Sequence, residues 1–236
     1  EGRARLLPAS VPYRKHVAQV LAYERTHETE AFFRSKLAGI DEPTAPFGLL
    51  DVHGDGGQIE EAQEKVDSEL TQRIRAQARR CAVSVATLFH AAWAIVVAHT
   101  SGRDDVVFGT VLLGRQQGTA SEQGILGIFM NTLPLRLRLR EVSCDELVEQ
   151  TRRELAELLN HEQASLAVAQ RCSGISGSAP LFSALLNYRH SAGQGLEHFN
   201  RGGMRILAAQ ERTNYPLTLS VDDFAADLAL KVQADR

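Results

Sequence analysis

The sequence has few cysteines, and their positions exclude several classes of small cross-linked or metal-bound domain. Cys81, Cys144 and Cys172 are odd in number and far apart, which argues against a disulfide framework and against a zinc site with paired ligands. Asp51, His53 and Asp55 alternate like calcium ligands, but Ala62 stands where such a loop needs a glutamate. We therefore expect no metal and a reducing, cytoplasmic location.

The sequence also lacks long apolar runs and a strong charge of either sign. No apolar run reaches the roughly 18 residues that span a bilayer, and residues 1–5 lead into no signal-peptide core. A net charge of -3 gives no broad attraction to nucleic acid or anionic lipid. We interpret Arg136, Arg138 and Arg140, which alternate with leucines, as the solvated face of a strand. The chain begins without methionine, and we expect a piece of a larger protein.

The composition that remains is that of a globular domain with helices. The 236 residues are 44% hydrophobic and 23% charged, enough to bury a sizeable core. Apolar periodicity predicts one helix, continuous or broken, within residues 12–37, and further helices over 68–80, 85–96 and 143–160. Ser68 is the expected N-cap of the second helix, and Ser143 with Glu146 forms a capping box before the last.

Strands are predicted between and after these helices. Residues 106–113 form a continuous apolar run, which predicts a central strand, whereas residues 133–139 alternate and predict one buried face. Pro134 keeps the start of that strand off a central ladder. Other strands are predicted over 181–188, 217–221 and 228–232, with 204–209 as a further candidate. The interleaved elements predict an α/β (α+β) sandwich in which helices pack on a mixed β-sheet.

Searches for catalytic motifs find none. Residues 174–178 resemble a nucleophile elbow but lack its closing glycine. His90 and His99 lie too far apart on one helix to share a metal ion. Asn131, Thr132 and Asn187 are polar residues in apolar strand surroundings. Such groups are either structural clasps or ligand contacts, and the physics of buried amides favours the clasp.

Several segments, in order, resemble condensation domains of nonribosomal peptide synthetases. Residues 12–18 resemble the Y-x-D-Y-A-x-W segment, with Lys15 and His16 in place of its Asp-Tyr. Residues 104–115, which include Gly109 and Arg115, are similar to D-D-V-V-x-G-x-x-x-x-x-R. Residues 126–136, which include Gly127 and Phe129, are similar to I-G-x-F-V-N-T-x-P-x-R, the most specific of these likenesses.

Three later segments continue this resemblance. Residues 161–166 begin with His161 and resemble H-Q-D-x-P-F in part, and residues 181–188 resemble the P-L-F-x-x-x-x-N strand. Residues 212–217, which include Pro216, resemble R-x-x-x-x-P-L. The likeness covers residues 12 to 234.

The resemblance implies a lobe of the chloramphenicol-acetyltransferase-like fold and a role in acyl transfer. In this family two lobes enclose a tunnel, and the active histidine lies in an H-H-x-x-x-D-G motif of the N-terminal lobe. This sequence has no His-His pair. The resemblance therefore implies a C-terminal lobe that supplies tunnel wall and carrier-docking scaffold, has no catalytic residue of its own and is inactive alone.

The resemblance also implies site residues, domain limits and partners. We expect Asn131, Thr132, Asn187, Arg212 and Asn214 to face or brace the tunnel, with a floor loop near residues 125–133. Residues 1–40 would end the N-terminal lobe or form a hinge, residues 41–66 a linker that need not hold a core, and residues 67–236 the C-terminal lobe. The partners would be the N-terminal lobe, donor and acceptor carrier domains that present 4′-phosphopantetheine arms, and an adjacent adenylation domain, with no cofactor bound directly.

Two alternatives stay open beside amide formation. A condensation-like domain could modify the tethered residue, for example by dehydrating serine or threonine, since the sequence departs from the family at Lys15, His16, residues 162–166 and residues 213–215. A noncatalytic domain could instead dock a tailoring enzyme or a carrier protein. The sequence upstream would separate these alternatives, because an intact histidine motif there supports catalysis.

Overall fold

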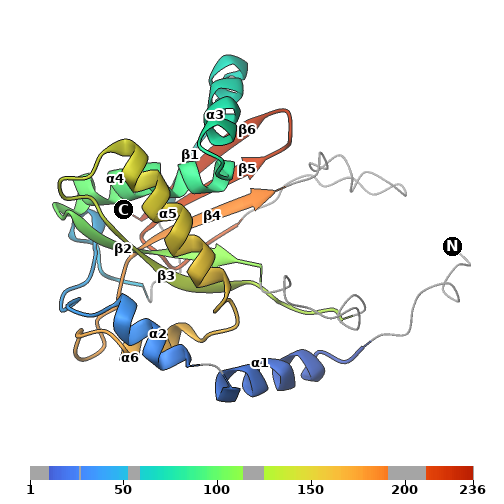
Figure 1. Ribbon diagram of the computed structural model, residues 1–236, viewed down its shortest axis with the longest axis vertical. Helices are drawn as coiled ribbons and strands as arrows, with labels where there is room; N and C mark the ends of the chain where they lie inside the picture. Colours follow the sequence, from blue (N-terminus) through green and yellow to red (C-terminus); the bar gives the residue numbers. More distant parts are fainter. Residues whose placement is uncertain (1–10, 27, 53–58, 114–124, 191–210, 236) are drawn as a thin grey trace, which may run out of the picture.

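The computed structural model describes residues 11–26, 28–52, 59–113, 125–190 and 211–235 (Figure 1). Within these residues, six strands form one sheet in the order β1-β6-β5-β4-β2-β3. The pairs β2–β4 and β4–β5 are parallel, and the other neighbours are antiparallel. The strands are β1 (Ile59–Val66), β2 (Asp105–Leu112), β3 (Asn131–Arg138), β4 (Ala184–His190), β5 (Leu217–Asp223) and β6 (Leu228–Asp235). The predicted mixed sheet packed by helices is confirmed.

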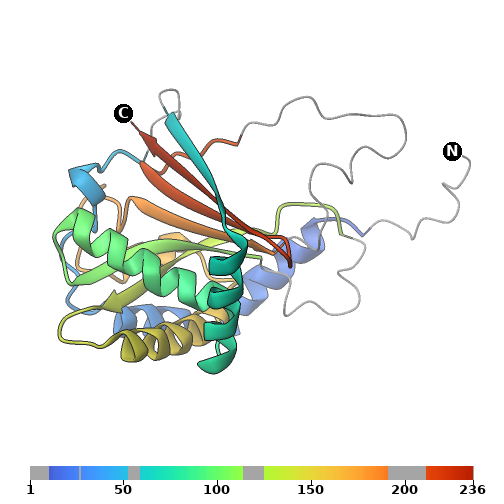
Figure 2. The same cartoon turned by 90° about the horizontal axis from the view of Figure 1, so that it is seen from above.

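Helices pack beside this sheet. They are α1 (Arg14–Thr26), α2 (Thr29–Lys36), α3 (Ser68–Arg80), α4 (Val85–Ser101), α5 (Cys144–Leu159) and α6 (Leu166–Arg171), with a 3₁₀ turn η2 (Pro46–Gly48). Figure 2 shows α4 and α5 on one side of the sheet. Leu133, Leu135 and Leu137 of β3 alternate toward this side and are buried. Trp93 and Val97 of α4 join the same core, so the main apolar core lies between these helices and the sheet.

Local sequence signals start the long helices. Ser143 and Glu146 form the predicted capping box before α5. The N-cap of α3 is Asp67, whose side chain accepts a hydrogen bond from the Leu70 amide at 2.8 Å, so the prediction of Ser68 was wrong by one residue. An aspartate carboxylate caps a helix as well as a serine hydroxyl does, and Asp67 directly precedes Ser68. Gly102 ends α4 in the left-handed conformation.

The segment predicted as a linker, residues 41–66, is more ordered than expected. Its last eight residues form β1, which pairs antiparallel with β6 at the edge of the sheet. The pattern hid this strand because charged residues lie on both of its faces, as an exposed edge permits. Thr44 is also buried, and its hydroxyl accepts a hydrogen bond from the Val107 amide at 3.0 Å. The segment therefore joins elements and also contributes a strand and a buried side chain, while the proposed domain limits stay predictions.

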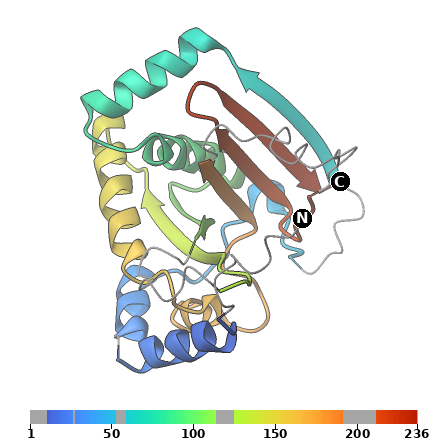
Figure 3. The same cartoon turned by 90° about the vertical axis from the view of Figure 1, so that its right-hand side faces the viewer.

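Most other element predictions are confirmed with shifted ends. The helix expected within residues 12–37 is broken into α1 and α2, and α2 lies beside α6 in the lower part of Figure 3. Pro134 lies in β3, an edge strand, as the missing amide hydrogen requires. The candidate strand over residues 204–209 lies outside the described residues.

Among the described residues, no single helix has the length and apolar character needed to cross a bilayer. The helices α3 and α4 reach that length only as a pair, and they meet at a bend of 104°.

Candidate functional site

One face of the sheet carries a row of polar side chains, which we call the polar row: Thr132, Asn187, Ser220 and Lys231. Asn187 pairs with Ser220, and Ser220 pairs with Lys231. Thr132 of β3 pairs with Val111 of β2. Thr110 pairs with Leu186 of β4, so the next residues along the two parallel strands, Val111 and Asn187, lie at the same level of the sheet. Paired residues point to the same face of a sheet, so the polar row lies on one face.

The polar row faces away from α4. The neighbouring Thr110 contacts the His90 ring of α4 through a hydrogen bond of 2.7 Å. Adjacent residues of a strand point to opposite faces, so Val111 and the polar row point the other way. Thr132 and Asn187 are half-buried and Ser220 is buried. The structure thus brings together two of the five predicted tunnel residues on a single polar surface.

Asn131 belongs to a different environment. Its side-chain amide donates to the backbone oxygens of Glu162 and Ala164 at 2.8 and 2.7 Å. Its oxygen accepts from the Thr132 amide at 2.9 Å. These bonds tie the start of β3 to the segment after α5. Asn131 is therefore a structural clasp, and its expected role at the tunnel stays a prediction.

The predicted floor loop rests on α1 and on the residues before it. A side chain at Gly127 would overlap the ring of Tyr13, which explains the glycine. The Tyr13 hydroxyl donates a hydrogen bond to the Ile128 backbone oxygen. Phe129 is buried and packs its ring on Tyr13 and His16, with centroids 5.8 and 4.6 Å apart. Gly127 and Phe129 therefore fix the path of the loop.

Gly109 allows close packing at the centre of the sheet. A methyl group there would lie 2.5 Å from the Phe182 ring and 2.8 Å from Leu185. Phe182 in turn stacks on Tyr215, with ring centroids 5.6 Å apart. The two rings line a cavity of about 350 Å³ together with α6. Two segments that resemble the family, residues 181–188 and 212–217, thus meet at this cavity.

The remaining predicted residues have separate surroundings. Arg212 and Asn214 are both exposed, and Asn214 donates to the Val52 backbone oxygen at 2.5 Å. Pro216 is buried, and its oxygen accepts from the Asp235 amide at 2.8 Å. His161 stacks on Phe32 with centroids 3.8 Å apart. Arg115 lies outside the described residues.

Arg136 is a largely buried, hydrogen-bonded side chain, although the sequence pattern predicted a solvated one. Its guanidinium donates two hydrogen bonds to Asp105, at 2.8 and 2.7 Å, and two more to the backbone oxygens of Lys36 and Ala38. Burial of Asp105 opposes ionisation, but the hydrogen bonds and charge of Arg136 outweigh it and lower the pKa of Asp105. The arginine side chain is only 9% exposed, so the prediction of a uniformly solvated arginine face was wrong. Asp105 lies 31 residues from Arg136 along the chain, so no local pattern of residues signals this pairing.

A second polar cluster joins α3 to the sheet around Asp223. This buried carboxylate accepts hydrogen bonds from Arg75 at 2.6 Å, from the Tyr188 hydroxyl at 2.5 Å and from the Ala225 amide at 3.1 Å. Burial alone would raise the pKa of Asp223, but these donors lower it to about 2. Burial and the same carboxylate raise the pKa of Tyr188. Because every partner is structural, we assign this cluster to stability.

The described residues hold no group of three or more histidine, cysteine or carboxylate side chains that could bind a metal ion. Asp222 and Asp223 point to opposite faces, since Asp222 pairs with Arg189 at 2.7 Å and Asp223 with Arg75. No pair of catalytic carboxylates results. The chemistry that this surface can supply is placement through polar donors and apolar walls.

Comparison with known proteins places this architecture. The sequence profile of the family described as Condensation domain matches residues 1–236. The chain is 48% identical over 246 residues to malpibaldin synthetase from Mortierella alpina, covering 99% of this chain and 4% of that protein. The chain therefore spans a small part of the curated relatives that it matches.

Solved structures share the fold. The X-domain from teicoplanin biosynthesis superposes with a TM-score of 0.76 at 17% identity, covering 94% of this chain and 53% of that chain. The condensation domain of the monacolin K polyketide synthase MokA gives a TM-score of 0.69 at 21% identity, covering 94% and 55%. The chain spans about half of each. A matching family profile over the whole chain, a close synthetase relative and the shared fold lead to one conclusion: this chain belongs to the condensation domain family.

Proposed function

We propose that this chain is the C-terminal part of a condensation domain that forms amide bonds between carrier-tethered aminoacyl or peptidyl thioesters. The polar row carries the proposal. Thr132 and Asn187 are half-buried on one face of a rigid sheet, which suits them to hold a polar substrate in a desolvated channel. The cavity of about 350 Å³ at Phe182 and Tyr215 offers apolar wall beside the same sheet.

The proposed reaction needs a base, and the sequence has no His-His pair that would match the histidine motif of the family. The acceptor amine attacks the thioester carbonyl, a carbon–nitrogen bond forms, the carbon–sulfur bond breaks and the thiol of the donor arm leaves. A histidine of the N-terminal lobe would orient the amine or take its proton. This chain would hold the two tethered reactants in line, a contribution that reaches several kcal/mol when reactants are well placed.

The surface around the floor loop supports an N-terminal lobe as partner. Leu126 is 85% exposed and Ile128 is 74% exposed, although burial of such side chains is favourable by about 1.5 to 3 kcal/mol each. Leu21 of α1 is exposed as well. We propose that an N-terminal lobe covers these residues. Separate carrier domains would deliver both substrates on phosphopantetheine arms, beside an adenylation domain.

Amide formation from loaded carriers, measured by mass spectrometry, tests this function. We expect product when the chain is combined with an N-terminal lobe that has an intact histidine motif, and none from the chain alone. Replacing Asn187 by alanine should slow the reaction about tenfold, the effect of losing one placed polar contact. Steady product from the chain alone that disappears in His161→Ala would overturn the assignment and place the catalytic centre here.

The same assay separates the alternatives that the sequence leaves open. A dehydrating domain would yield a tethered residue lighter by one water. A docking domain would bind loaded carriers and leave both substrates unchanged. Either outcome with the complete domain would contradict amide formation.

A further inference from the structure

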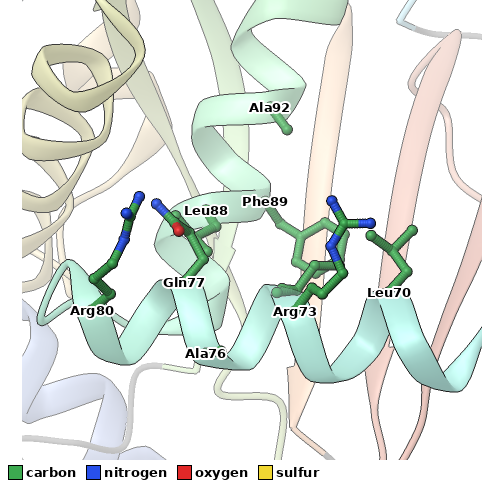
Figure 4. A pocket seen from close by; sticks show the side chains of 9 residues that line it. Leu70, Arg73, Ala76, Gln77, Arg80, Leu88, Phe89 and Ala92 are labelled. Carbon is green, nitrogen blue, oxygen red and sulfur yellow. The ribbon is translucent and has the colours of Figure 1, made fainter.

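An open apolar groove lies between α3 and α4, apart from the polar row and the floor loop. Its volume is about 560 Å³. Leu70 and Ile74 form one wall, and Leu88, Phe89 and Ala92 form the other. Figure 4 shows the lining side chains of α3 rising toward the first turns of α4. Leu70 is 41% exposed, so its side chain adds to the solvent-accessible apolar lining of the groove.

The rim of this groove is cationic. Arg73 and Arg80 border it, and Figure 4 shows both on the side of α3 that faces α4. The helix α3 carries four arginines and a single acidic residue, Glu69, although the whole chain has a net charge of -3. Within the part of the chain that the structure describes, neither Arg73 nor Arg80 has a carboxylate within ion-pair distance. Arg80 also lines a second hollow with Asp145 and Glu149 of α5, and Glu149 pairs with Arg152 at 2.6 Å.

The spacing of the two arginines fits a helical ligand. Seven residues of helix separate Arg73 from Arg80, which corresponds to about 10 Å along the axis, or two turns. The groove from Leu70 to Arg80 is about 15 Å long by the same rise, the length of about three turns. Grooves between two helices accept a third helix through interdigitated side chains, and carboxylates beside an apolar stripe complement arginines.

We propose that this groove binds an amphipathic α-helix of a partner protein. The apolar stripe of that helix lies between α3 and α4, and two of its carboxylates, spaced two turns apart, pair with Arg73 and Arg80. The charge of the rim selects an acidic helix over a basic one. This binding site does not depend on the condensation reaction, so its failure would leave the proposed function untouched.

Fluorescence anisotropy with two matched peptides tests the proposal on the 236-residue chain. The acidic probe is a labelled helical peptide with a leucine stripe and two glutamates seven residues apart, and the basic probe has lysines in their place. We expect the acidic probe to bind and to lose about tenfold in affinity when Arg73→Glu and Arg80→Glu are combined, because two attractions become repulsions. Added salt should weaken the same binding.

Two variants make the test specific. Arg79→Glu reverses one arginine charge on the same helix, whereas the double variant reverses two. Arg79 is exposed and does not line the groove, so the affinity for the acidic probe should fall only through weaker long-range charge attraction. Ala92→Trp fills the groove from an exposed position and should abolish binding while the circular dichroism spectrum stays native. Equal binding of both probes, no binding of the acidic probe, or equal losses in Arg79→Glu and in the double variant would overturn the proposal. Self-association that Ala92→Trp abolishes and the probe does not inhibit would assign the groove to a second copy and overturn it too.

Discussion

His90 is a buried side chain whose hydrogen bonds specify its protonation. Nδ1 lies 2.7 Å from the Ala86 backbone oxygen, which can only accept, so Nδ1 carries the proton. Nε2 then accepts from the Thr110 hydroxyl at 2.7 Å. Burial lowers the pKa of His90 from 6.5 to about 4, although the hydrogen bond to Ala86 acts in the opposite direction. The folded protein therefore holds a neutral histidine.

This pKa predicts a loss of stability in mild acid. The unfolded chain protonates His90 near pH 6.5 and the folded chain only near pH 4, so protonation favours unfolding between these values. Stability from this group is complete above about pH 6.5, and we expect about 1.5 kcal/mol of it to be lost by about pH 5. Urea unfolding at both pH values measures the loss. His90→Gln should remove most of this pH dependence, whereas His99→Gln, at an exposed position of the same helix, should retain it; an unchanged slope in His90→Gln would contradict the assignment.

Asn131 and Asn187 are two asparagines with different expected roles. Asn131→Ala leaves two backbone oxygens without their donor, and we expect a loss of about 1 to 3 kcal/mol in unfolding free energy. Asn131→Asp should cost more, because a carboxylate would face the Glu162 and Ala164 oxygens. Asn187→Ala should change stability by less than about 1 kcal/mol while it slows the complete domain. A larger loss of unfolding free energy in Asn187→Ala than in Asn131→Ala would contradict this assignment of the two roles.

At the scale of elements, the floor loop and Tyr13 form a matched pair. Gly127→Ala would drive a methyl group into the Tyr13 ring, so we expect faster proteolysis within residues 125–130 and a loss of about 1 to 3 kcal/mol, typical of overpacking. The same substitution in a Tyr13→Ala background should cost little, because the ring is absent. In a double-mutant cycle, the loss of unfolding free energy caused by Gly127→Ala should therefore be smaller by about 1 kcal/mol or more in the Tyr13→Ala background, a coupling typical of residues in contact. Additive effects would show that the glycine serves another purpose.

The same scale shows which elements the sequence specifies. Elements with one apolar stripe, such as α5 and β3, were predicted because burial imposes a period on their residues. The strand β1 was missed because its neighbour β6 satisfies its backbone on one side while both faces bear charges. The anchor at Arg136 was missed for a related reason. Its partners Asp105, Lys36 and Ala38 are remote along the chain, and a local pattern cannot report a tertiary hydrogen bond.

The candidate site repeats this lesson. Polar residues inside apolar strands could be singled out from the sequence, but their division into the polar row and the Asn131 clasp depends on register and on the segment after α5. Gly109 and Gly127 could be predicted as special by resemblance alone. The rings of Phe182 and Tyr13, which explain these glycines, become visible only in three dimensions.

At the scale of the whole molecule, the distribution of exposed apolar residues predicts how the chain behaves without a partner. Leu126, Ile128 and Met130 of the floor loop are 85%, 74% and 61% exposed, and Val17 and Leu21 of α1 are exposed as well. Monomeric proteins seldom expose contiguous apolar patches above a few hundred Å². We therefore expect the isolated chain to bind a hydrophobic dye and to self-associate, and a co-expressed N-terminal lobe to suppress both.

Matched substitutions locate the responsible surface. Leu126→Ser combined with Ile128→Ser should reduce dye fluorescence and the weight-average mass of the isolated chain. Both side chains are exposed, so the substitutions make the surface polar and remove no buried contact. Val96→Ser should change neither quantity, since Val96 is 44% exposed but lies on α4, apart from the floor loop. Dye fluorescence and light scattering across the three proteins provide the measurement. If the double variant still associates, or if the N-terminal lobe leaves wild-type association unchanged, the floor loop is not the surface that meets the other lobe.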